Sequence, residues 1–349
     1  VPPADAVVNP RQADCPYPFK HLCGAAVAYK VICCLYEAYG IPKEETEEFL
    51  EFAGFATVGD VMDLIGENRI LVKEGLKRLN HTQNVGMASL IRACGLEEKE
   101  IKSYHIGFVL GPCINAGGRL DTAKRSLNLL LQKDRAKADV MAAELKTLND
   151  ERKDMTQTGA EEAIEWIEKE GRSQDKVLVV YLPDCHESLA GIIAGRIRER
   201  YNKPVFVLTD SIDGVKGSGR SIEAYSMFEE MSKCKELYTK YGGHPMAAGL
   251  SLPKENVEKF RTFLNEHTTL TEEDFIPKIT IDVPMPIGYV TEHLIEELSV
   301  LEPFGKGNEK PLFAEKNLNI LSMRILGKNR NTLKMQARSQ HGTVMDALY

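Results

Sequence analysis

The feature that most restricts how this chain can fold is a long helical pattern near its centre. From Leu120 to about Ile167 the apolar residues recur at helical spacing, and no proline interrupts them. A helix of this length without internal caps indicates either a connector between two lobes or a coiled coil. The apolar stripe is short and rich in alanine, which favours the connector. We therefore predict a connector helix over residues 131–170.

After Gly171 the sequence changes to short apolar runs that alternate with helical patterns. This alternation indicates an α/β domain. The predicted strands are Val177–Leu182 and Pro204–Leu208, and the predicted helices are Ser188–Tyr201 and Ala224–Tyr238. His186 and Glu187 follow the first strand, at the end where α/β domains place ligands. His186 is either a loop histidine or a substrate contact.

The last part of the chain has the pattern of an antiparallel sheet. Residues Thr332–Arg338 alternate strictly between polar and apolar side chains, which is typical of a half-exposed strand. Together with Leu318–Ile325 and Val344–Tyr349, this strand predicts the beginning of a small β-barrel.

The composition is that of an ordinary soluble protein, with 43% hydrophobic and 27% charged residues. No apolar run is long enough to span a bilayer, and no signal-peptide pattern is present. The eight cysteines form no CxxC pair and are best interpreted as reduced thiols, so we expect a cytoplasmic location. The net charge of −7 is concentrated in residues 131–170 and 251–275, so it does not exclude a basic groove elsewhere.

Two glycine-rich runs between residues 216 and 252 carry candidate phosphate-binding chemistry. In the first run, Gly217 and Gly219 would let backbone N–H groups approach an anion, and Ser218 would add a hydroxyl donor. Arg220 offers a planar guanidinium that can hold two phosphate oxygens at once. The alternative is an ordinary turn, since glycine runs are common where no anion binds.

The second run is Gly242-Gly243-His244-Pro245-Met246-Ala247-Ala248-Gly249. Its paired glycines predict a tight turn that directs the histidine outward, and the small residues that follow leave room for a ligand. A lone histidine is more often structural, so this run by itself leaves both interpretations open.

Two positions earlier in the chain are further candidates. Asp60 lies among apolar residues, where a carboxylate needs a partner or a metal ion. A helix cap or a salt bridge is the structural alternative. Residues 111–120 predict a turn that places Arg119 at the mouth of the next helix, where backbone N–H groups favour an anion. The alternative there is a packing loop with a surface arginine.

Four stretches, taken in order, resemble the RecJ single-strand exonucleases of the DHH phosphoesterase superfamily. They are VVNPRQADCPYPFKHLCG (7–24), GPCINAGGRLDTA (111–123), KGSGRS with GGHPMAAGLSL (216–221 and 242–252) and LEPFGKGNEKPLF (301–313). The resemblance covers most of the chain and implies an α/β protein of four parts. These are the remainder of a DHH phosphoesterase domain (1–130), the long connector helix (131–170), an α/β DHH-associated nucleic-acid-binding domain (171–275) and a partial OB-like β-barrel (276–349).

The resemblance also implies roles for the candidate residues. Asp60 matches the metal-binding aspartate of a TVxDVxxL stretch, and His244 would be the catalytic residue that contacts the scissile or adjacent phosphate. Cys113 stands where the family commonly has arginine. The residues implied to hold nucleic-acid phosphates are Arg119, Ser218, Gly219, Arg220, Gly242, Gly243 and His244.

The implied activity is 5′-to-3′ degradation of single-stranded DNA in recombination and repair, with two Mn²⁺ or Mg²⁺ ions. The Asp-His-His triplet and the Asp-x-Asp pair of the superfamily are absent, so we expect a chain truncated at both ends and without nuclease activity by itself. The implied partners are single-stranded DNA and a repair helicase or a single-strand-binding protein, and no membrane.

Two other functions remain open at this point. One is hydrolysis of short oligonucleotides or small phosphodiesters, against which the LEPFGKGNEKP segment and the β-domain argue. The other is a non-catalytic single-strand-binding protein, which the missing metal ligands make plausible.

Overall fold

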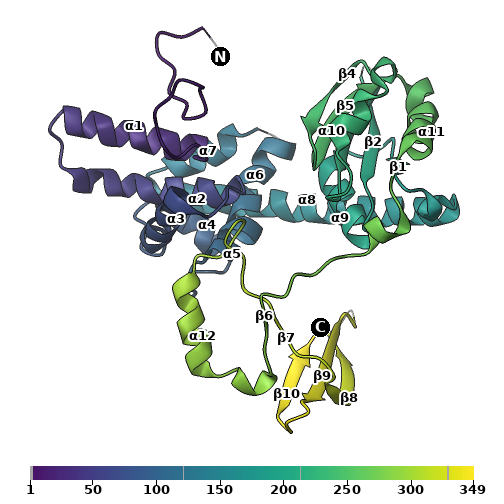
Figure 1. Cartoon of the computed structure of the whole chain (residues 1–349). Coiled ribbons are helices and arrows are strands. Elements are labelled where there is room, and N and C mark those ends of the chain that lie inside the picture. The colour runs from purple at the N-terminus through teal and green to yellow at the C-terminus, as the bar shows by residue number, and fades with distance from the viewer. Residues whose placement is uncertain (1–2, 121, 213, 328–329) are drawn as a thin grey trace. The chain divides into compact units, whose positions relative to one another are not determined.

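The computed structural model describes residues 3–120, 122–212, 214–327 and 330–349 (Figure 1). The chain divides into two compact units. Unit 1 comprises Val1–Asn84, Cys94–Gly111 and Ile279–Tyr349, and unit 2 comprises Val85–Ala93 and Pro112–Lys278. Within the described ranges, no helix is long and apolar enough to cross a membrane.

Unit 2 is built on a five-stranded sheet with the order β1-β2-β3-β5-β4. Strands β1 and β2 are parallel, and the other neighbours are antiparallel. The strands are β1 (Leu178–Tyr181), β2 (Val205–Ser211), β3 (Gly214–Arg220), β4 (Lys240–His244) and β5 (Ala247–Leu252). The helices are α4 (Val85–Ala93), α6 (Gly111–Leu120, from the last residue of unit 1), α7 (Lys124–Leu131), α8 (Arg135–Lys169), α9 (Ala190–Tyr201), α10 (Met227–Ser232) and α11 (Val257–His267).

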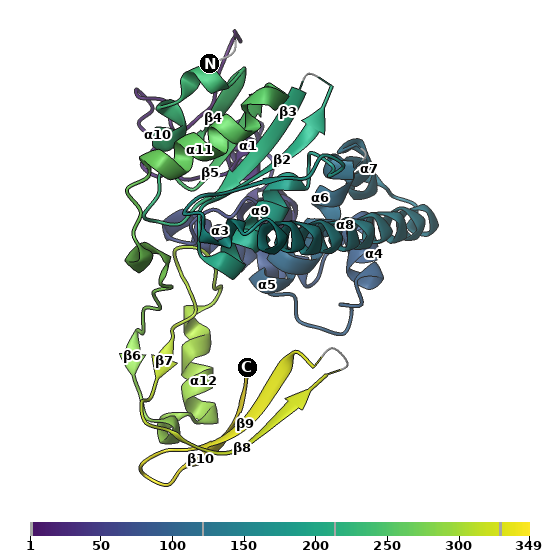
Figure 2. The same ribbon diagram turned by 90° about the vertical axis from the view of Figure 1, so that its right-hand side faces the viewer.

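Helices cover both faces of this sheet, with α8 and α9 on one side and α10 and α11 on the other (Figure 2). Strand β2 supplies both cores. Its Val205 and Val207 belong to the apolar cluster of Ile193 in α9, whereas the ring of Phe206 lies 5.0 Å from that of Phe260 in α11. A strand buried on both faces has a continuous apolar run instead of an alternating one. The predicted α/β class is therefore confirmed.

The long helix predicted over residues 131–170 corresponds to the 35-residue helix α8 (Arg135–Lys169), but the helical pattern that begins at Leu120 is divided before it. Helix α7 ends at Leu131, and α8 begins at Arg135. Between them, Asp134 is extended, and its carboxylate accepts a hydrogen bond from the backbone N–H of Lys137 (3.1 Å). Aspartate is a favoured N-cap residue, so the helical pattern contained a signal for the start of a new helix. The predicted turn over residues 111–120 is wrong, because these residues form helix α6.

Unit 1 contains a helical part and a small β part. Its helices are α1 (Gly24–Ala38), α2 (Leu50–Gly59), α3 (Gly66–Leu79), α5 (Ser103–His105) and α12 (Glu292–Leu298), and a π-helix covers Ile106–Leu110. Helices α2 and α3 approach closely at two glycines. A Cβ atom at Gly54 would lie 3.0 Å from the Cα atom of Gly75, so only glycine allows this packing distance.

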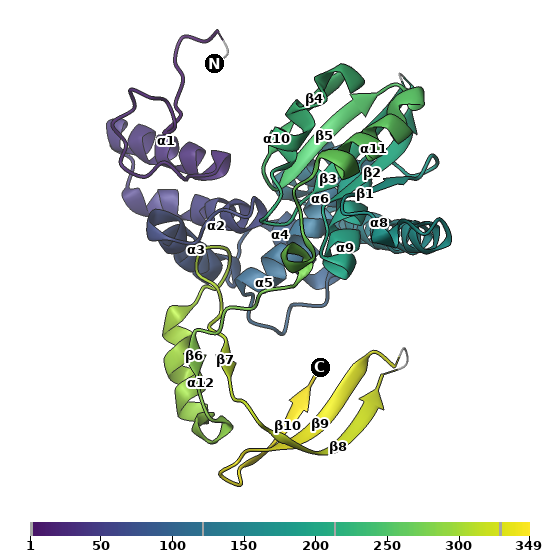
Figure 3. The ribbon, with the colours of Figure 1, turned by 45° about the vertical axis from the view of Figure 1, so that its right-hand side comes forward.

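The β part of unit 1 has a three-stranded antiparallel sheet of order β10-β9-β8 (Figure 3). The strands are β8 (Asn319–Leu326), β9 (Thr332–Arg338) and β10 (Val344–Leu348), and a pair is formed by β6 (Val283–Pro284) and β7 (Phe313–Ala314). The strand predicted over residues 332–338 coincides with β9. The sheet is not closed, in agreement with the expected partial barrel.

Candidate nucleic-acid interface

The middle of the candidate site is a row of three small residues across β3, β5 and β4. Ser218 lies directly opposite Gly249, which lies directly opposite Gly242. Directly opposite residues of neighbouring strands share one face of a sheet. The row carries a single hydroxyl and two positions without side chains, so the backbone of another molecule can approach the sheet closely.

Basic residues lie in the two neighbouring rows, one on each side of this row. In one of them, Arg220 is opposite Ala247, and Ala247 is opposite His244. In the other, Lys216 and Lys240 are both opposite Ser251, on its two sides. The face therefore has small residues in its middle and cations at its Arg220 end and its Lys216 end, which suits a chain of phosphates. We call these three rows the basic sheet face.

The loop interpretation of residues 216–221 is wrong, because most of them form strand β3 between β2 and β5. The ladders on both sides use the backbone groups that were expected to bind an anion. Gly219 faces the core: a Cβ atom there would stand 2.6 Å from Sδ of Met227 and 2.8 Å from the ring of Phe206. The glycines of β3 thus permit core packing instead of anion contact.

Gly243 is also directed away from the basic sheet face. It lies opposite Ala248 with a φ of +154°, and a Cβ atom there would come within 2.7 Å of the Ala248 Cα atom. The turn itself comes later, at Pro245 and Met246. The structure therefore brings Ser218, Arg220, Gly242 and His244 together on one face but does not place Gly219 and Gly243 with them.

The guanidinium of Arg220 lies against the first turn of α9. Its Nη1 donates to the backbone carbonyl of Gly219 (2.8 Å), and the side chain is half-buried. A Cβ atom added to Gly191 would stand 2.9 Å from Nη2 of Arg220. The absence of a side chain at Gly191 thus makes the space in which this guanidinium sits.

A pocket of about 330 Å³ opens between the basic sheet face and the beginning of α9. Glu187, Ser188 and Ala190 form one wall, and Lys216, Ser218 and Gly249 are among the residues of the other. The ammonium of Lys216 lies 2.7 Å from the carboxylate of Glu187. The N-terminal end of a helix favours anions through its free N–H groups, so this pocket has the electrostatics of a phosphate site.

Comparisons with known proteins agree with this geometry. The DHHA1 domain model matches residues 174–269, and the RecJ OB domain model matches residues 281–349. The single-stranded-DNA-specific exonuclease RecJ of Bacillus subtilis is 37% identical over 344 residues, which cover 97% of this chain and 43% of the relative.

Two solved structures show the same fold. The crystal structure of RecJ with Mn²⁺ from Thermus thermophilus matches with a TM-score of 0.83 and 30% identity, covering 96% of this chain and 48% of that one. A crystal structure of exonuclease RecJ bound to manganese has a TM-score of 0.65 and 31% identity, covering 78% of this chain and 67% of that one. This chain belongs to the RecJ family. It spans about half the length of the Bacillus and Thermus relatives.

One site position of this RecJ family member, Lys240, was not recognised from the sequence; it completes a row of the basic sheet face. Gly249 and Glu187 were noted in the sequence, but their roles were not: Gly249 is the middle of the serine–glycine row, and Glu187 pairs with Lys216 at the pocket. Period-two alternation from Lys216 to Arg220 could have indicated the shared face, since alternate strand residues point the same way. No comparable sequence pattern indicates the pairing with β4 and β5.

The sequence candidate His186 is exposed, and its Nδ1 lies 2.7 Å from the Ser188 hydroxyl.

Asp60 and Arg119, two positions implied by the RecJ resemblance, are not residues of the strands that form this face. Asp60 is an exposed residue at the C-terminal end of α2 in unit 1. The structure describes no group of three or more His, Cys, Asp or Glu side chains that could hold a metal ion, so its described residues do not make up a metal centre. The role of Asp60 stays a prediction. Arg119 is in α6, but its side chain lies outside the described part of the chain.

The RecJ-like LEPFGKGN stretch has a structural role within unit 1 that the resemblance did not indicate. The backbone N–H of Leu64 donates to the carbonyl of Lys306 (2.6 Å). The ammonium of Lys306 lies 2.8 Å from the Asp63 carboxylate, and this hydrogen bond lowers the pKa of Asp63. The stretch therefore holds the loop that follows Asp60.

A larger hollow of about 1990 Å³ also lies within unit 1, beside α3 and α12. Its walls mix apolar side chains with lysines and glutamates, including the ion pair between Lys102 and Glu302 (3.0 Å). Such a mixed lining has no preference for an anion. The small pocket beside α9 is therefore the better phosphate site despite its size.

Proposed function

We propose that this chain binds single-stranded DNA through the basic sheet face of unit 2. The carrying observation is the cross-strand order of Arg220, Ala247 and His244 beside Ser218, Gly249 and Gly242. Backbone phosphates would lie over the glycine–serine row, and the cations of the two neighbouring rows would neutralise them. His244 would contact a phosphate at the β4 edge of the face.

We further propose that the protein degrades single-stranded DNA from the 5′ end towards the 3′ end, as an exonuclease of recombination and repair. The Bacillus relative is named a single-stranded-DNA-specific exonuclease, and Thermus RecJ structures contain Mn²⁺ or Mg²⁺. Two such ions would supply a metal-activated water and stabilise the leaving oxygen. Asp60 would be one ligand, although no group of three or more candidate ligands is found among the described residues.

The Arg220 end of the face would hold a terminal 5′-phosphate, together with Ser218 and Arg119. A terminal phosphate carries more negative charge than an internal phosphodiester, and a guanidinium can bind two of its oxygens. The half-buried position of Arg220 at the start of α9 supports this role, because the helix terminus favours the same anion.

The test is a binding titration with 5′-phosphorylated and 5′-hydroxyl single-stranded DNA. Arg220→Ala should weaken binding of the phosphorylated strand by about 1.5–3 kcal/mol, as for a lost hydrogen bond between charged groups. The affinity for the 5′-hydroxyl strand should fall less.

The affinity for DNA should also fall as the salt concentration rises, with a slope near −0.7 per phosphate contact. Chelation by EDTA should leave binding unchanged, because the face consists of arginine, lysine, histidine and serine.

Lys259→Ala is the matched control, because it removes an exposed cation from α11, which covers the opposite face of the sheet. This variant should bind like the wild type. Equal losses for both strands with Arg220→Ala would make this arginine a general backbone contact. No measurable binding by the wild-type chain at low salt would refute the proposed interface.

A further inference from the structure

The ion pair between Lys216 and Glu187 lies in the lining of the phosphate pocket. The distance between Nζ and Oε2 is 2.7 Å, and both side chains are about half exposed, at 50% and 53%. Glu187 comes from the segment before α9, whereas Lys216 projects from β3. The pair thus joins the two walls of the pocket.

The charges along the basic sheet face are therefore uneven. Among the described residues that line the pocket, Glu187 is the only acidic one, and it neutralises Lys216. A phosphate that binds at the Lys216 end must therefore replace this carboxylate.

We propose that Glu187 is an internal counter-ion that a DNA phosphate displaces from Lys216, so that Glu187 sets how tightly this end of the face binds a strand. The inference rests on the proposed function. An exposed ion pair is weak, so a phosphate can compete for the lysine. The displaced carboxylate stays beside the strand and repels it, so the lysine contributes little net affinity. A weakly held end lets the strand leave this part of the face while the Arg220 end still holds it.

The test is a double-mutant cycle on the 349-residue chain with a 5′-hydroxyl oligodeoxythymidine as the probe. Glu187→Gln keeps the size of the side chain and removes its charge. We expect this variant to bind about two- to fivefold more tightly at low salt, the range set by an exposed ion pair. Its salt slope should become steeper by about 0.7, because one more phosphate contact forms without releasing a carboxylate.

Lys216→Gln completes the cycle. In the wild type it should change affinity by less than about twofold, whereas in the Glu187→Gln background it should remove the whole gain. Glu266→Gln is the charge-matched control, because Glu266 is an exposed residue of α11 on the opposite side of the sheet. It should reproduce neither the tighter binding nor the steeper slope.

The outcomes separate this inference from the proposed interface. If Arg220→Ala weakens binding but Glu187→Gln leaves it unchanged or weaker, the interface stands and the counter-ion role is wrong. If Glu187→Gln and Glu266→Gln tighten binding equally, the effect comes from net charge, which also refutes the role. A wild-type chain that fails to bind the probe overturns both.

Discussion

The guanidinium of Arg220 occupies the space that a side chain at Gly191 would need. Nη2 lies 2.9 Å from the position of a Cβ atom on Gly191, and the other two guanidinium contacts are at 3.4 Å. Gly191 is the second residue of α9, whereas Arg220 is the last residue of β3. The placement of the arginine therefore depends on a glycine that shares no strand with it.

Gly191→Ala should move the Arg220 side chain and weaken DNA binding without unfolding the protein. Alanine is about 1 kcal/mol better than glycine inside a helix, which offsets part of the strain of the new contact. We expect a severalfold loss of affinity for 5′-phosphorylated DNA, smaller than the loss with Arg220→Ala. Titration and thermal unfolding of the same samples measure both effects.

Gly195→Ala is the control for this substitution. Gly195 lies one turn further along α9, and a Cβ atom there would meet nothing within 4 Å. It should raise the free energy of unfolding by about 0.5–1 kcal/mol and leave DNA binding unchanged. Equal binding losses from the two variants would show that α9 itself, and not the space beside Arg220, matters for DNA.

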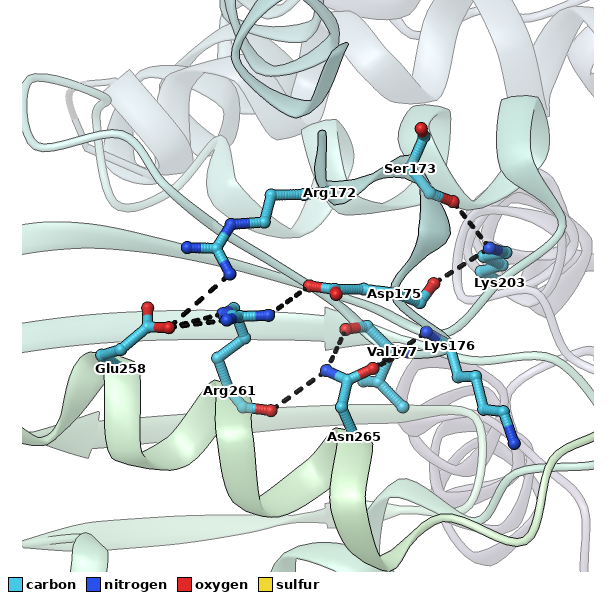
Figure 4. A network of polar contacts seen from close by, with 9 residues as sticks. All are labelled: Arg172, Ser173, Asp175, Lys176, Val177, Lys203, Glu258, Arg261 and Asn265. Carbon is cyan, nitrogen blue, oxygen red and sulfur yellow. Dashed lines mark hydrogen bonds and ion pairs between the residues drawn. The ribbon is translucent and has the colours of Figure 1, made fainter. Parts of the chain in front are cut away.

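Asn265→Ala should destabilise unit 2, because the Asn265 amide hydrogen bonds to the backbone at the start of β1 (Figure 4). Its Oδ1 accepts from the N–H groups of Lys176 (2.8 Å) and Val177 (3.1 Å), and its Nδ2 donates to the carbonyl of Val177 (2.9 Å). Unpaired buried backbone groups cost about 1–3 kcal/mol. Urea unfolding should show a loss of this size.

Glu266→Ala tests whether this loss is specific to the amide. Glu266 is the next residue of α11 and is exposed. A surface substitution of this kind changes the free energy of unfolding by less than about 0.5 kcal/mol. A comparable loss in both variants would point to the helical propensity of α11 instead of the hydrogen bonds to β1.

Arg69→Ala should loosen the LEPFGKGN stretch in unit 1. Nη2 of Arg69 donates to the carbonyls of Val300 (3.2 Å), Leu301 (3.0 Å) and Glu302 (3.4 Å). Removing this donor leaves three carbonyls to water, so amide hydrogen exchange over residues 299–306 should become faster. Lys73→Ala on the same helix is the control and should leave exchange unchanged. Protection that survives Arg69→Ala would assign the docking to the Lys306 contacts alone.

Glu51→Gln should stabilise the protein at neutral pH. Glu51 is 5% exposed in α2, and burial raises the pKa of its carboxyl, although a hydrogen bond with Thr82 lowers it in part. The folded state thus holds the proton to a higher pH than the unfolded state. Stability from this group is fully present below the ordinary glutamate pKa and is lost as pH rises through the raised value.

Unfolding measurements across this pH range check the prediction. The wild type should lose stability as pH rises above the ordinary glutamate value, and Glu51→Gln should remove that part of the dependence. A variant with an unchanged pH profile would mean that Glu51 ionises without cost in the folded protein.

Local sequence patterns predicted secondary structure correctly where a pattern is compatible with one kind of element only. The alternation over residues 332–338 corresponds to β9, and the apolar run after Gly171 lies in β1. The residues of β9 alternate between polar and apolar, whereas β1 is a continuous apolar run whose Val179 and Val180 belong to the cores on opposite faces of the sheet. The helical pattern from Leu120 to Ile167 indicated the long helix α8 but not its start, because the N-cap Asp134 lies inside a strong helical pattern.

The sequence by itself determined the α/β class, the β strands near the C-terminus and the residue types of the candidate site. The tertiary structure decided which of these residues share a surface. The glycines in residues 216–221 are equally compatible with an anion-binding loop and with a strand that packs against large side chains. Phe206 and Met227 settled this, because they fill the space beside Gly219 and turn Ser218 and Arg220 to the other face. Such packing depends on residues distant in the chain, which local patterns do not encode.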